Sequence, residues 1–360
     1  MPVVRLAAVG DVLLATDPSG LGPTCDAEAR LDGVRGLLEG CDIVVGNLEC
    51  ALPGSGETVP TEPRVVATPH LVRRVVEGTF NVVSLANNHT FDCLEGGYHQ
   101  VRDLLKEIQV SCFGAGDDLE GAAAPAVLNV KGIRVALLGA VDERSGARQF
   151  AGPHQCGVAP FDMGRMADDI RRLCRQVDHV VVSLHWGEER FLFPSPMQIE
   201  QARALAEAGA SLVLGHHPHV IQGMEVHQGV PIIYSLGSFL ASDVPFANGD
   251  VLTWNRAERT GCVLTADLAR AGAVNVRQVP IHDRGDRIEV DGSGFGAKRI
   301  ARANKALSRG VTPARYRREY FRVKTIKPIL DHLRWSELKR LRLRSLRNAL
   351  GGILRARKAE

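Results

Sequence analysis

Short apolar blocks recur along this chain, and nearly every block is followed by glycine or by a polar residue. The blocks lie at residues 6–9, 43–45, 82–85, 135–138, 180–184, 212–214 and 232–234. Between them are stretches typical of helices, at residues 71–77, 97–107, 168–176 and 199–207. Alternation of buried strands with amphipathic helices predicts an α/β sheet. The polar residues after the blocks predict that functional groups gather at the strand ends.

The chain is long enough for one large core or two ordinary ones, with 360 residues of which 45% are hydrophobic. Short alternating strands at residues 263–268, 274–280 and 286–290 predict a second sheet or an extension of the first sheet's edge. After residues 292–294 the chain becomes basic, with helical spacing at 326–333 and 338–354. We therefore expect a catalytic domain over residues 1–297 and a basic helical C-terminal extension over residues 298–360.

The net charge of +3 hides an uneven distribution along the chain. Residues 298–360 contain 20 Lys and Arg against 4 Asp and Glu, whereas residues 1–297 contain 24 against 37. Such an extension suits an acidic peptide, an anionic lipid or nucleic acid, and it equally suits packing against an acidic body. It lacks an aromatic-interleaved recognition motif, so nucleic acid is the partner that we favour least.

The N-terminal segment and the cysteines indicate the cellular compartment. The first apolar run is too short to span a membrane and lacks the charged and long apolar regions of a signal peptide. Eight cysteines, at positions 25, 41, 50, 93, 112, 156, 174 and 262, form no Cys-x-x-Cys pair or zinc-ribbon spacing. We expect a cytoplasmic protein without membrane attachment, with reduced thiols. No pattern predicts the oligomeric state.

Three histidines within four residues, His216, His217 and His219, follow the apolar run 212–214. A single histidine in a loop is usually solvated, but three at a strand end favour a metal or acid/base site. The rigid Pro218 allows His217 and His219 to direct two nitrogens at one ion. Spacing alone does not decide which two of the three histidines bind.

The other strand ends carry oxygen and nitrogen ligands as well. They are Asp11, Asn47 with Glu49, Asn87, Asn88 and His89 with Asp92, and His185 with Glu188 and Glu189. Each group alone fits a turn or a buried hydrogen bond. Together they predict a divalent-cation site at one edge of the sheet. His89 and Asp92 are also an acid/base candidate, because a carboxylate one helical turn away fixes the imidazole tautomer and raises its basicity.

In these motifs the chain resembles the CapA family, named for poly-γ-glutamate capsule biosynthesis, which is similar to the calcineurin-like metallophosphoesterases. The resemblance covers residues 4–282. It rests on Gly10-Asp11-Val12, Asn47-Leu48-Glu49, Leu85-Ala86-Asn87-Asn88-His89, Gly114-Ala115-Gly116, His185-Trp186-Gly187, Gly215-His216-His217-Pro218-His219 and Tyr234-Ser235-Leu236-Gly237. It implies a four-layer α/β/β/α sandwich of the calcineurin-like fold. The implied metal ligands are Asp11, Glu49, Asn88, His185, His217 and His219, and His89 matches the outer-shell acid.

Two positions depart from the family pattern. Leu13 stands where a two-metal phosphoesterase usually has the histidine of Asp-x-His, so one metal position lacks a nitrogen ligand. Ser238 replaces the asparagine that commonly ends the Tyr-Ser-Leu-Gly motif. Two-metal hydrolysis needs both ions to clamp the attacking and leaving oxygens, so the first departure argues against a full binuclear site.

A single cation flanked by His/Asp pairs suits epimerisation at a Cα carbon, in which one base removes a proton and an acid returns one. His89 with Asp92 is the first pair, and His216 or His217 with Asp11 is the second. The chain is also similar to CapA-like proteins that tailor ribosomally made peptides, including lasso-peptide epimerases. The predicted partner is therefore a peptide or precursor-peptide substrate.

Four further residues are candidates for contact with substrate, namely Asn87, Trp186, Glu189 and Ser235, although Trp186 equally fits a packing role. A metallophosphoesterase is the alternative, with Arg64 or Arg190 supplying positive charge. The third possibility is a binding protein that acts through the basic extension. The oxygen ligands favour Ca, Mg or Mn and the histidines favour Zn, Fe or Mn, so the sequence does not identify the divalent metal.

Overall fold

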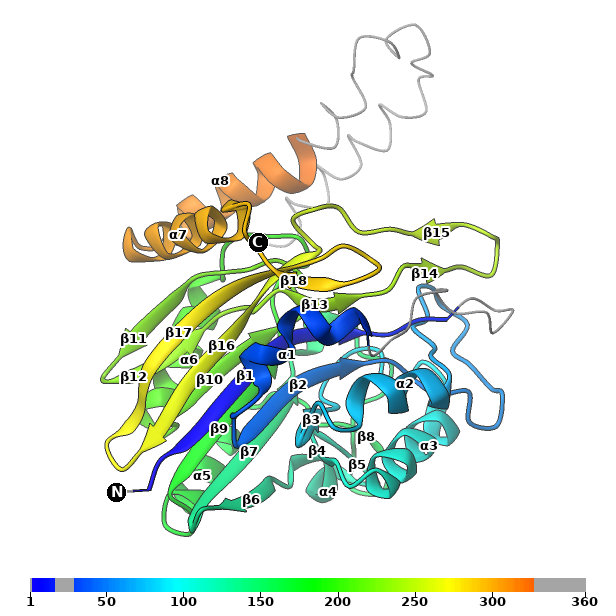
Figure 1. Ribbon diagram of the computed structural model, residues 1–360, viewed down its shortest axis with the longest axis horizontal. Helices are drawn as coiled ribbons and strands as arrows, with labels where there is room; N and C mark the ends of the chain where they lie inside the picture. The colour runs from blue at the N-terminus through cyan, green and yellow to red at the C-terminus, as the bar shows by residue number, and fades with distance from the viewer. Residues whose placement is uncertain (1, 17–28, 327–360) are drawn as a thin grey trace, which may run out of the picture. The chain divides into compact units, whose positions relative to one another are not determined.

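The computed structural model describes residues 2–16 and 29–326, in which two large sheets lie face to face (Figure 1). The first sheet contains β1 (Val4–Leu13), β2 (Ile43–Glu49), β3 (Val82–Ser84), β4 (Ser111–Phe113), β13 (Ser238–Ala241), β16 (Thr260–Ala269), β17 (Gly272–Asp283) and β18 (Ile288–Val290). The second contains β6 (Ala126–Val130), β7 (Ile133–Val141), β9 (His179–His185), β10 (Leu212–His216), β11 (Met224–His227) and β12 (Val230–Ile233). Two small pairs are β5 (Ala115–Gly116) with β8 (Gly157–Val158), and β14 (Val244–Pro245) with β15 (Val251–Leu252).

The helices lie between the strands along the chain. They are α1 (Asp32–Leu38), α2 (Pro69–Val76), α3 (Leu94–Glu107), α4 (Leu119–Ala123), α5 (Met163–Leu173), α6 (Pro196–Glu207), α7 (Phe295–Ser308) and α8 (Pro313–Phe321), with the short turns η1 (Ala29–Leu31), η2 (Glu143–Ser145) and η3 (Arg322–Ile326). The predicted helices correspond to α2, α3, α5 and α6. Three of these begin at side-chain caps, Thr68 before α2, Asp162 before α5 and Ser195 before α6, each accepting a hydrogen bond from a backbone N–H of the first turn.

The strand order brings the parallel strand ends to one edge. The first sheet runs β18-β17-β16-β1-β2-β3-β4, with β1 to β4 parallel and β13 also paired with β1. The second runs β11-β12-β10-β9-β7-β6, with β12, β10, β9 and β7 parallel. The antiparallel strands β16, β17 and β18 extend the first sheet. Of the two predicted alternatives, the edge extension is therefore the one that forms.

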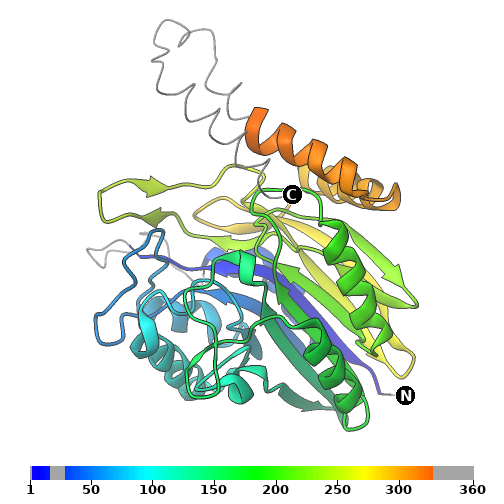
Figure 2. The same cartoon turned by 180° about the vertical axis from the view of Figure 1, so that it is seen from behind.

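Alternate residues of β1 face two different layers of the core. Leu6 and Ala8 belong to the apolar cluster that joins the two sheets, whereas Ala7 and Val9 belong to the cluster that includes α1, α2 and α3. The helices α5 and α6 lie on the outer side of the second sheet (Figure 2). The predicted α/β/β/α sandwich is thus confirmed.

The chain divides into two compact units, Met1–Arg309 and Gly310–Glu360. The boundary expected after residue 297 falls inside α7, which packs on β11, β16 and β17 of the first unit. In the second unit the described residues form α8 and η3, and the helical pattern predicted beyond residue 326 lies outside the described residues. Within residues 2–16 and 29–326, no helix has the length and apolar character needed to cross a bilayer.

Candidate metal centre

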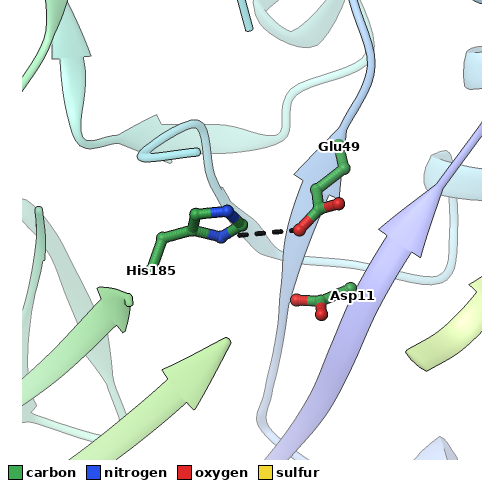
Figure 3. A group of neighbouring side chains, drawn as sticks. All are labelled: Asp11, Glu49 and His185. Atoms are coloured by element: carbon green, nitrogen blue, oxygen red, sulfur yellow. Dashed lines mark ion pairs between the residues drawn. The ribbon is translucent and has the colours of Figure 1, made fainter. Parts of the chain in front are cut away.

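Asp11, Glu49 and His185 meet at the carboxyl ends of β1, β2 and β9, so the two sheets together supply this cluster (Figure 3). One ligand atom from each lies within 4.8 Å of the other two. His185 Nδ1 is 3.4 Å from Glu49 Oε1, and all three side chains are buried. Metal–ligand bonds of about 2.0–2.6 Å allow ligand atoms at such separations to share one ion.

Glycines hold two of the neighbouring backbones in close contact. A Cβ atom on Gly10, directly before Asp11, would lie 1.8 Å from the carbonyl oxygen of Gly237. A Cβ atom on Gly215, directly before His216, would lie 1.9 Å from the carbonyl oxygen of Tyr234. Only glycine fits at either position, so the Gly-Asp and Gly-His steps of the sequence are required by the backbone as well as by the chemistry.

Asn47 lies at the centre of the cluster and is fully buried. Its Nδ2 donates to Asp11 Oδ1 at 3.0 Å and to Glu49 Oε1 at 2.9 Å, and it lies 3.2 Å from His185 Nδ1. An amide group has two hydrogens, so it serves two of these three neighbours at a time. The sequence places Asn47 at a strand end but gives no signal for this bridging position.

The histidine cluster surrounds Asp11 in three different ways. His216 Nδ1 lies 3.2 Å from Asp11 Oδ1, and the backbone N–H of His217 donates to Asp11 Oδ2 at 3.2 Å. His219 Nδ1 is 3.2 Å from Asp11 Oδ2, and its Nε2 is 3.8 Å from Glu49 Oε2. Of the two second pairs that the sequence left open, the side chain that contacts Asp11 is that of His216, while His217 contacts it through the backbone.

His217 and His219 have left-handed backbone conformations, with φ of +93° and +53°. This region is costly for residues with a Cβ atom, at about 1–3 kcal/mol each, and such strain concentrates at functional sites. Pro218 between them restricts the loop further. The loop therefore holds its histidines in fixed positions against the two acids.

The buried acids and imidazoles shift one another's proton affinity. Burial would raise the pKa of Asp11, but hydrogen bonding to His216 and His219 outweighs it and holds that pKa well below its usual range. Burial, followed by repulsion from Asp11, raises the pKa of Glu49 well above its usual range. Burial would lower the pKa of His219, but Glu49 and Asp11 raise it to about 9. Burial lowers the pKa of His217 to about 4 and that of His185 well below its ordinary value.

The donors of this cluster fit a divalent cation. Among the described residues, two buried atoms around it, Glu49 Oε2 and His217 Nδ1, lack a hydrogen-bond partner, although burying such atoms unpaired is unfavourable. Asp11, Glu49 and His185 would hold the ion. Further ligands could come from neighbouring residues, namely His219, His217 and Asn88. The mixture of carboxylate oxygen and imidazole nitrogen suits manganese and does not separate it from calcium, magnesium or zinc.

His89 and Asp92 form a buried pair next to the cluster. His89 Nδ1 lies 2.8 Å from Asp92 Oδ2, which also accepts the backbone N–H of Val65 at 2.7 Å. Arg148 Nε is 3.4 Å from Asp92 Oδ1, and the Arg148 guanidinium donates to the carbonyl of Pro63 at 3.1 Å. Asp92 is therefore fixed on both oxygens. Arg148 was not predicted from the sequence, because it lies in a loop with no recognisable motif.

Asn88 connects this pair to the metal cluster. Its Oδ1 lies 2.9 Å from His185 Nε2, and its Nδ2 lies 3.2 Å from His89 Nε2. The contacts thus run without a break from Asp92 through His89 and Asn88 to His185. Asn87 supports this arrangement, because its Oδ1 accepts the backbone N–H of His89 at 3.0 Å and its amide donates to the carbonyl of Leu48 at 2.8 Å.

The remaining predicted substrate contacts lie at different depths. Trp186 is fully buried, stacks on Tyr234 and donates to the Tyr234 carbonyl at 3.3 Å. Ser235 is also fully buried, and its hydroxyl accepts the N–H of Gly237 at 3.1 Å. Glu189 is exposed; partial desolvation would raise its pKa, but His219 and His217 outweigh this and lower it. Glu189 is thus the one of these three that reaches solvent.

The two departures from the family pattern occupy different environments. Leu13 is buried in the apolar cluster that includes α1, α2 and α3, so β1 supplies no second nitrogen ligand there. Ser238 Oγ is buried and has no hydrogen-bond partner within residues 2–16 and 29–326. The serine therefore leaves a polar position unfilled where the pattern commonly has asparagine.

Trp254 and Arg190 lie over the histidine loop. The Trp254 ring is 5.1 Å from that of His219, and the Arg190 guanidinium lies 5.7 Å from the Trp254 ring. Arg190 is partly exposed and pairs with Glu258 at 3.4 Å, and Arg64 pairs with Glu62 at 2.5 Å. Both arginines named for phosphate binding are therefore engaged with acids. Trp254 was not predicted as a site residue, because its contact with His219 joins segments that are far apart in the sequence.

Comparisons with known proteins identify relatives of this arrangement. The model of the bacterial capsule synthesis protein family PGA_cap matches residues 5–243. The capsule biosynthesis protein CapA of Bacillus anthracis is 30% identical over 245 residues, which cover 66% of this chain and 59% of the relative. The PGA biosynthesis protein CapA of Bacillus subtilis is 30% identical over 244 residues, covering 66% and 63%. The chain therefore spans about three-fifths of the length of these relatives.

More distant similarities extend to other bacteria. A probable polyglutamine synthesis accessory protein of Mycobacterium tuberculosis is 28% identical over 214 residues, covering 54% of each chain. Among solved structures, a novel phosphatase from Mycoplasma pneumoniae aligns with a TM-score of 0.49 and 11% identity, covering 81% of this chain and 96% of that one. A 5'-nucleotidase precursor from Thermus thermophilus aligns with a TM-score of 0.44 and 14% identity, covering 86% and 59%. At these TM-scores neither structure bears on the reaction.

Proposed function

The chain belongs to the bacterial capsule synthesis protein family, and from this premise we propose that it is a metal-dependent enzyme that transfers protons on a polypeptide substrate. Relatives named for PGA biosynthesis and for polyglutamine synthesis support a substrate built of linked amino acids. The buried donor set of Asp11, Glu49 and His185 supports the metal dependence.

The observation that carries the proposal is the His89–Asp92 pair beside the metal centre. With a hydrogen on Nδ1 donated to Asp92 at 2.8 Å, the Nε2 atom of His89 is the basic nitrogen. That nitrogen points toward Asn88, 3.2 Å away, and Asn88 contacts His185. A base oriented by a buried carboxylate next to a cation site is the arrangement that proton abstraction requires.

A divalent cation held by Asp11, Glu49 and His185 would orient a substrate carboxylate or carbonyl and polarise it. The protein's own part is to position the base. Asp92 fixes the imidazole of His89, and Arg148 together with the Val65 N–H fixes Asp92. Burial of this pair keeps competing water away from the exchanged proton.

For the reaction itself, the proposal is epimerisation at the Cα carbon of one residue of the peptide. His89 Nε2 takes the Cα proton from one face, and a second acid returns a proton to the opposite face, so the substrate loses and gains one hydrogen. His216 suits the second role because its Nδ1 contacts Asp11 at 3.2 Å. His216 contacts the metal cluster through Asp11, whereas His89 contacts it through Asn88, so the two histidines reach the cluster from different residues.

The test is mass-spectrometric uptake of deuterium from D₂O into glutamate-containing oligopeptides with free C-termini, with Mn²⁺ and with a chelator. The expected result is one deuterium per peptide, lost on chelation and lost in His89→Gln. His227→Gln is the matched control, because His227 forms an exposed pair with Glu207 at 2.7 Å away from the centre. That control should exchange at the wild-type rate.

Two results would reject the epimerase. One is the absence of deuterium uptake together with metal-dependent release of phosphate from an aryl phosphate, which would identify a phosphoesterase. The other is full uptake in His89→Gln, which would remove the base assigned here.

A further inference from the structure

Helix α7 presents four exposed cations in a row, Lys298, Arg302, Lys305 and Arg309, which we call the α7 stripe. Spacings of four, three and four residues place them on one side of the helix. The row covers about 17 Å, given a rise of 1.5 Å per residue. A strongly cationic surface of this length is complementary to an extended anionic chain.

The opposite side of α7 is fixed against the first unit. Ala303 and Leu307 are buried, and both lie close to Gly223 at the start of β11. Asn304 Oδ1 accepts the backbone N–H of Met224 at 2.8 Å. This packing holds the helix orientation, so the stripe faces away from the body.

No acidic side chain neutralises the stripe within the described part of the chain. None of its four members makes an ion pair or side-chain hydrogen bond there. The arginines of α5 are different, because Arg171 pairs with Asp168 at 2.8 Å and Arg172 with Asp169 at 2.7 Å. Cations that lack internal partners retain their full charge for an external ligand.

Side-chain contacts and the short chain segment between Arg256 and Glu258 join the metal centre to the first residue of α7. Trp254 packs against His219 and lies under Arg190, which pairs with Glu258. Two residues before Glu258, the exposed Arg256 lies over the ring of Phe295 at 4.4 Å and donates to Ser293 at 2.7 Å. Helix α7 packs on β17 and β11, beside which it is drawn in Figure 1.

From this placement we propose that the α7 stripe binds an acidic segment of the polypeptide whose reacting residue enters the metal centre, an inference that rests on the proposed function. Arg190 and Arg256 lead from the centre to the stripe. Carboxylates on alternate residues of an extended chain recur about every 6.6–7 Å. Successive members of the stripe are about 4.5–6 Å apart along the helix, and the long lysine and arginine side chains span the difference.

An acidic polypeptide fits this surface better than nucleic acid. Single strands bind through aromatic rings on which the bases stack. The one aromatic residue of α7, Phe295, lies beside two guanidiniums, those of Arg256 at 4.4 Å and Arg299 at 5.7 Å. The stripe thus offers charge without a stacking surface.

The test uses fluorescence anisotropy on the full chain with a labelled glutamate decapeptide, a glutamine decapeptide and a single-stranded oligodeoxynucleotide of equal charge. The stripe variant replaces Lys298, Arg302, Lys305 and Arg309 by glutamine, which maintains helix propensity. The control variant replaces Arg165, Arg171, Arg172 and Arg175, exposed residues of α5 and the turn after it, and so changes the net charge equally.

We expect the stripe variant to bind the glutamate peptide at least about tenfold more weakly, since four modest ion-pair contributions combine. The control variant and circular-dichroism melting should match the wild type, and the glutamine peptide should not bind. Should the full stripe variant fail to fold, the pair Arg302→Gln with Lys305→Gln provides the same comparison with a smaller loss.

Equal binding by the stripe variant would overturn the inference, as would tighter binding of the oligonucleotide through the same four residues. Deuterium exchange on short neutral peptides separates this inference from the enzymatic proposal. The stripe variant should exchange such peptides at the wild-type rate, whereas a failed enzymatic proposal would abolish exchange and leave glutamate-peptide binding intact.

Discussion

Two groups of buried carboxylates in the first sheet differ in what neutralises them. Asp283, at the end of β17, accepts hydrogen bonds from Arg30 at 2.6 Å and from the N–H groups of Ala241 and Gly285 at 2.9 and 2.8 Å. Asp11 and Glu49 lie next to each other, and their hydrogen-bond and ion-pair partners among the described residues are histidines and amide groups, with no lysine or arginine. Each carboxylate is fully or almost fully buried.

The difference separates a structural charge from a functional one. A buried carboxylate with a guanidinium and two backbone donors is neutralised by the protein itself. At the Asp11–Glu49 pair, which has no lysine or arginine partner among the described residues, burial and the Asp11 charge raise the pKa of Glu49, and Glu49 Oε2 is left unpaired. A divalent cation bound by Asp11, Glu49 and His185 would add positive charge to that of the His219 imidazolium and would take up the unpaired ligand atoms.

Asp11→Asn should give the largest effect, because it removes a ligand charge from the cluster. Loss of several kcal/mol of metal-dependent stabilisation corresponds to a fall in deuterium exchange on the order of a thousandfold. Exchange assays and metal analysis by mass spectrometry after gel filtration measure both consequences. If the variant bound as much metal as the wild type, Asp11 would not be a metal ligand, and the proposed difference between Asp11 and Asp283 would be wrong.

Asp283→Asn should act on folding instead of on metal binding. Breaking the buried pair leaves Arg30 charged and without its partner, which costs about 3–5 kcal/mol of unfolding free energy. Urea denaturation monitored by circular dichroism measures the loss. Replacing Arg30 by methionine in the same chain should recover part of it, and unchanged stability in the single variant would contradict our account of Asp283.

Metal addition should stabilise the wild type and not Asp11→Asn. Manganese at about a hundred times its dissociation constant raises the unfolding free energy by about 2.7 kcal/mol when it binds only the folded state. Thermal melts with Mn²⁺ and with a chelator provide the measurement. An equal shift in Asp11→Asn would locate the bound ion elsewhere.

The smallest effect is expected at Asp42, a half-buried carboxylate whose partner is an exposed lysine. Lys131 lies 2.7 Å from Asp42 Oδ2, and its hydrogen bond lowers the pKa of Asp42 below the ordinary 3.8. Lys131→Gln should cost at most about 1 kcal/mol. Because the folded pKa is the lower one, this contribution is present above pH 3.8 and disappears as the pH falls through the folded pKa. The urea midpoints of the wild type and Lys131→Gln should therefore converge as the pH falls through that range. A difference that stays constant with pH would show that the Lys131–Asp42 pair is not the cause of the stability difference.

The strands and the gathering of polar groups at their ends follow from local sequence patterns. Apolar blocks identify β1, β2, β9 and β10, and the residue after each block identifies the edge where Asp11, Glu49 and His185 meet. These features are predictable because parallel strands in one sheet share the direction of their carboxyl ends.

Contacts between distant segments were not predictable in the same way. The choice of His216 over His217 as the side chain on Asp11 depends on the left-handed backbone of the loop, which the sequence leaves open. Arg148 and Trp254 reach the site from loops without periodicity. Helix α7 joins the first unit through contacts with Gly223 and Met224, which no local pattern encodes.

The glycines before Asp11 and His216 restrict how this site can be changed by mutation. At Gly10 and Gly215 even one added methyl group meets a carbonyl oxygen at under 2 Å, so the gap between these backbones has a fixed minimum width. Single substitutions at these glycines therefore cannot widen the metal cluster by small steps. A new substrate range would have to come from exposed residues beside the histidine loop, such as Glu189 and Arg190, with the strand ends left as they are.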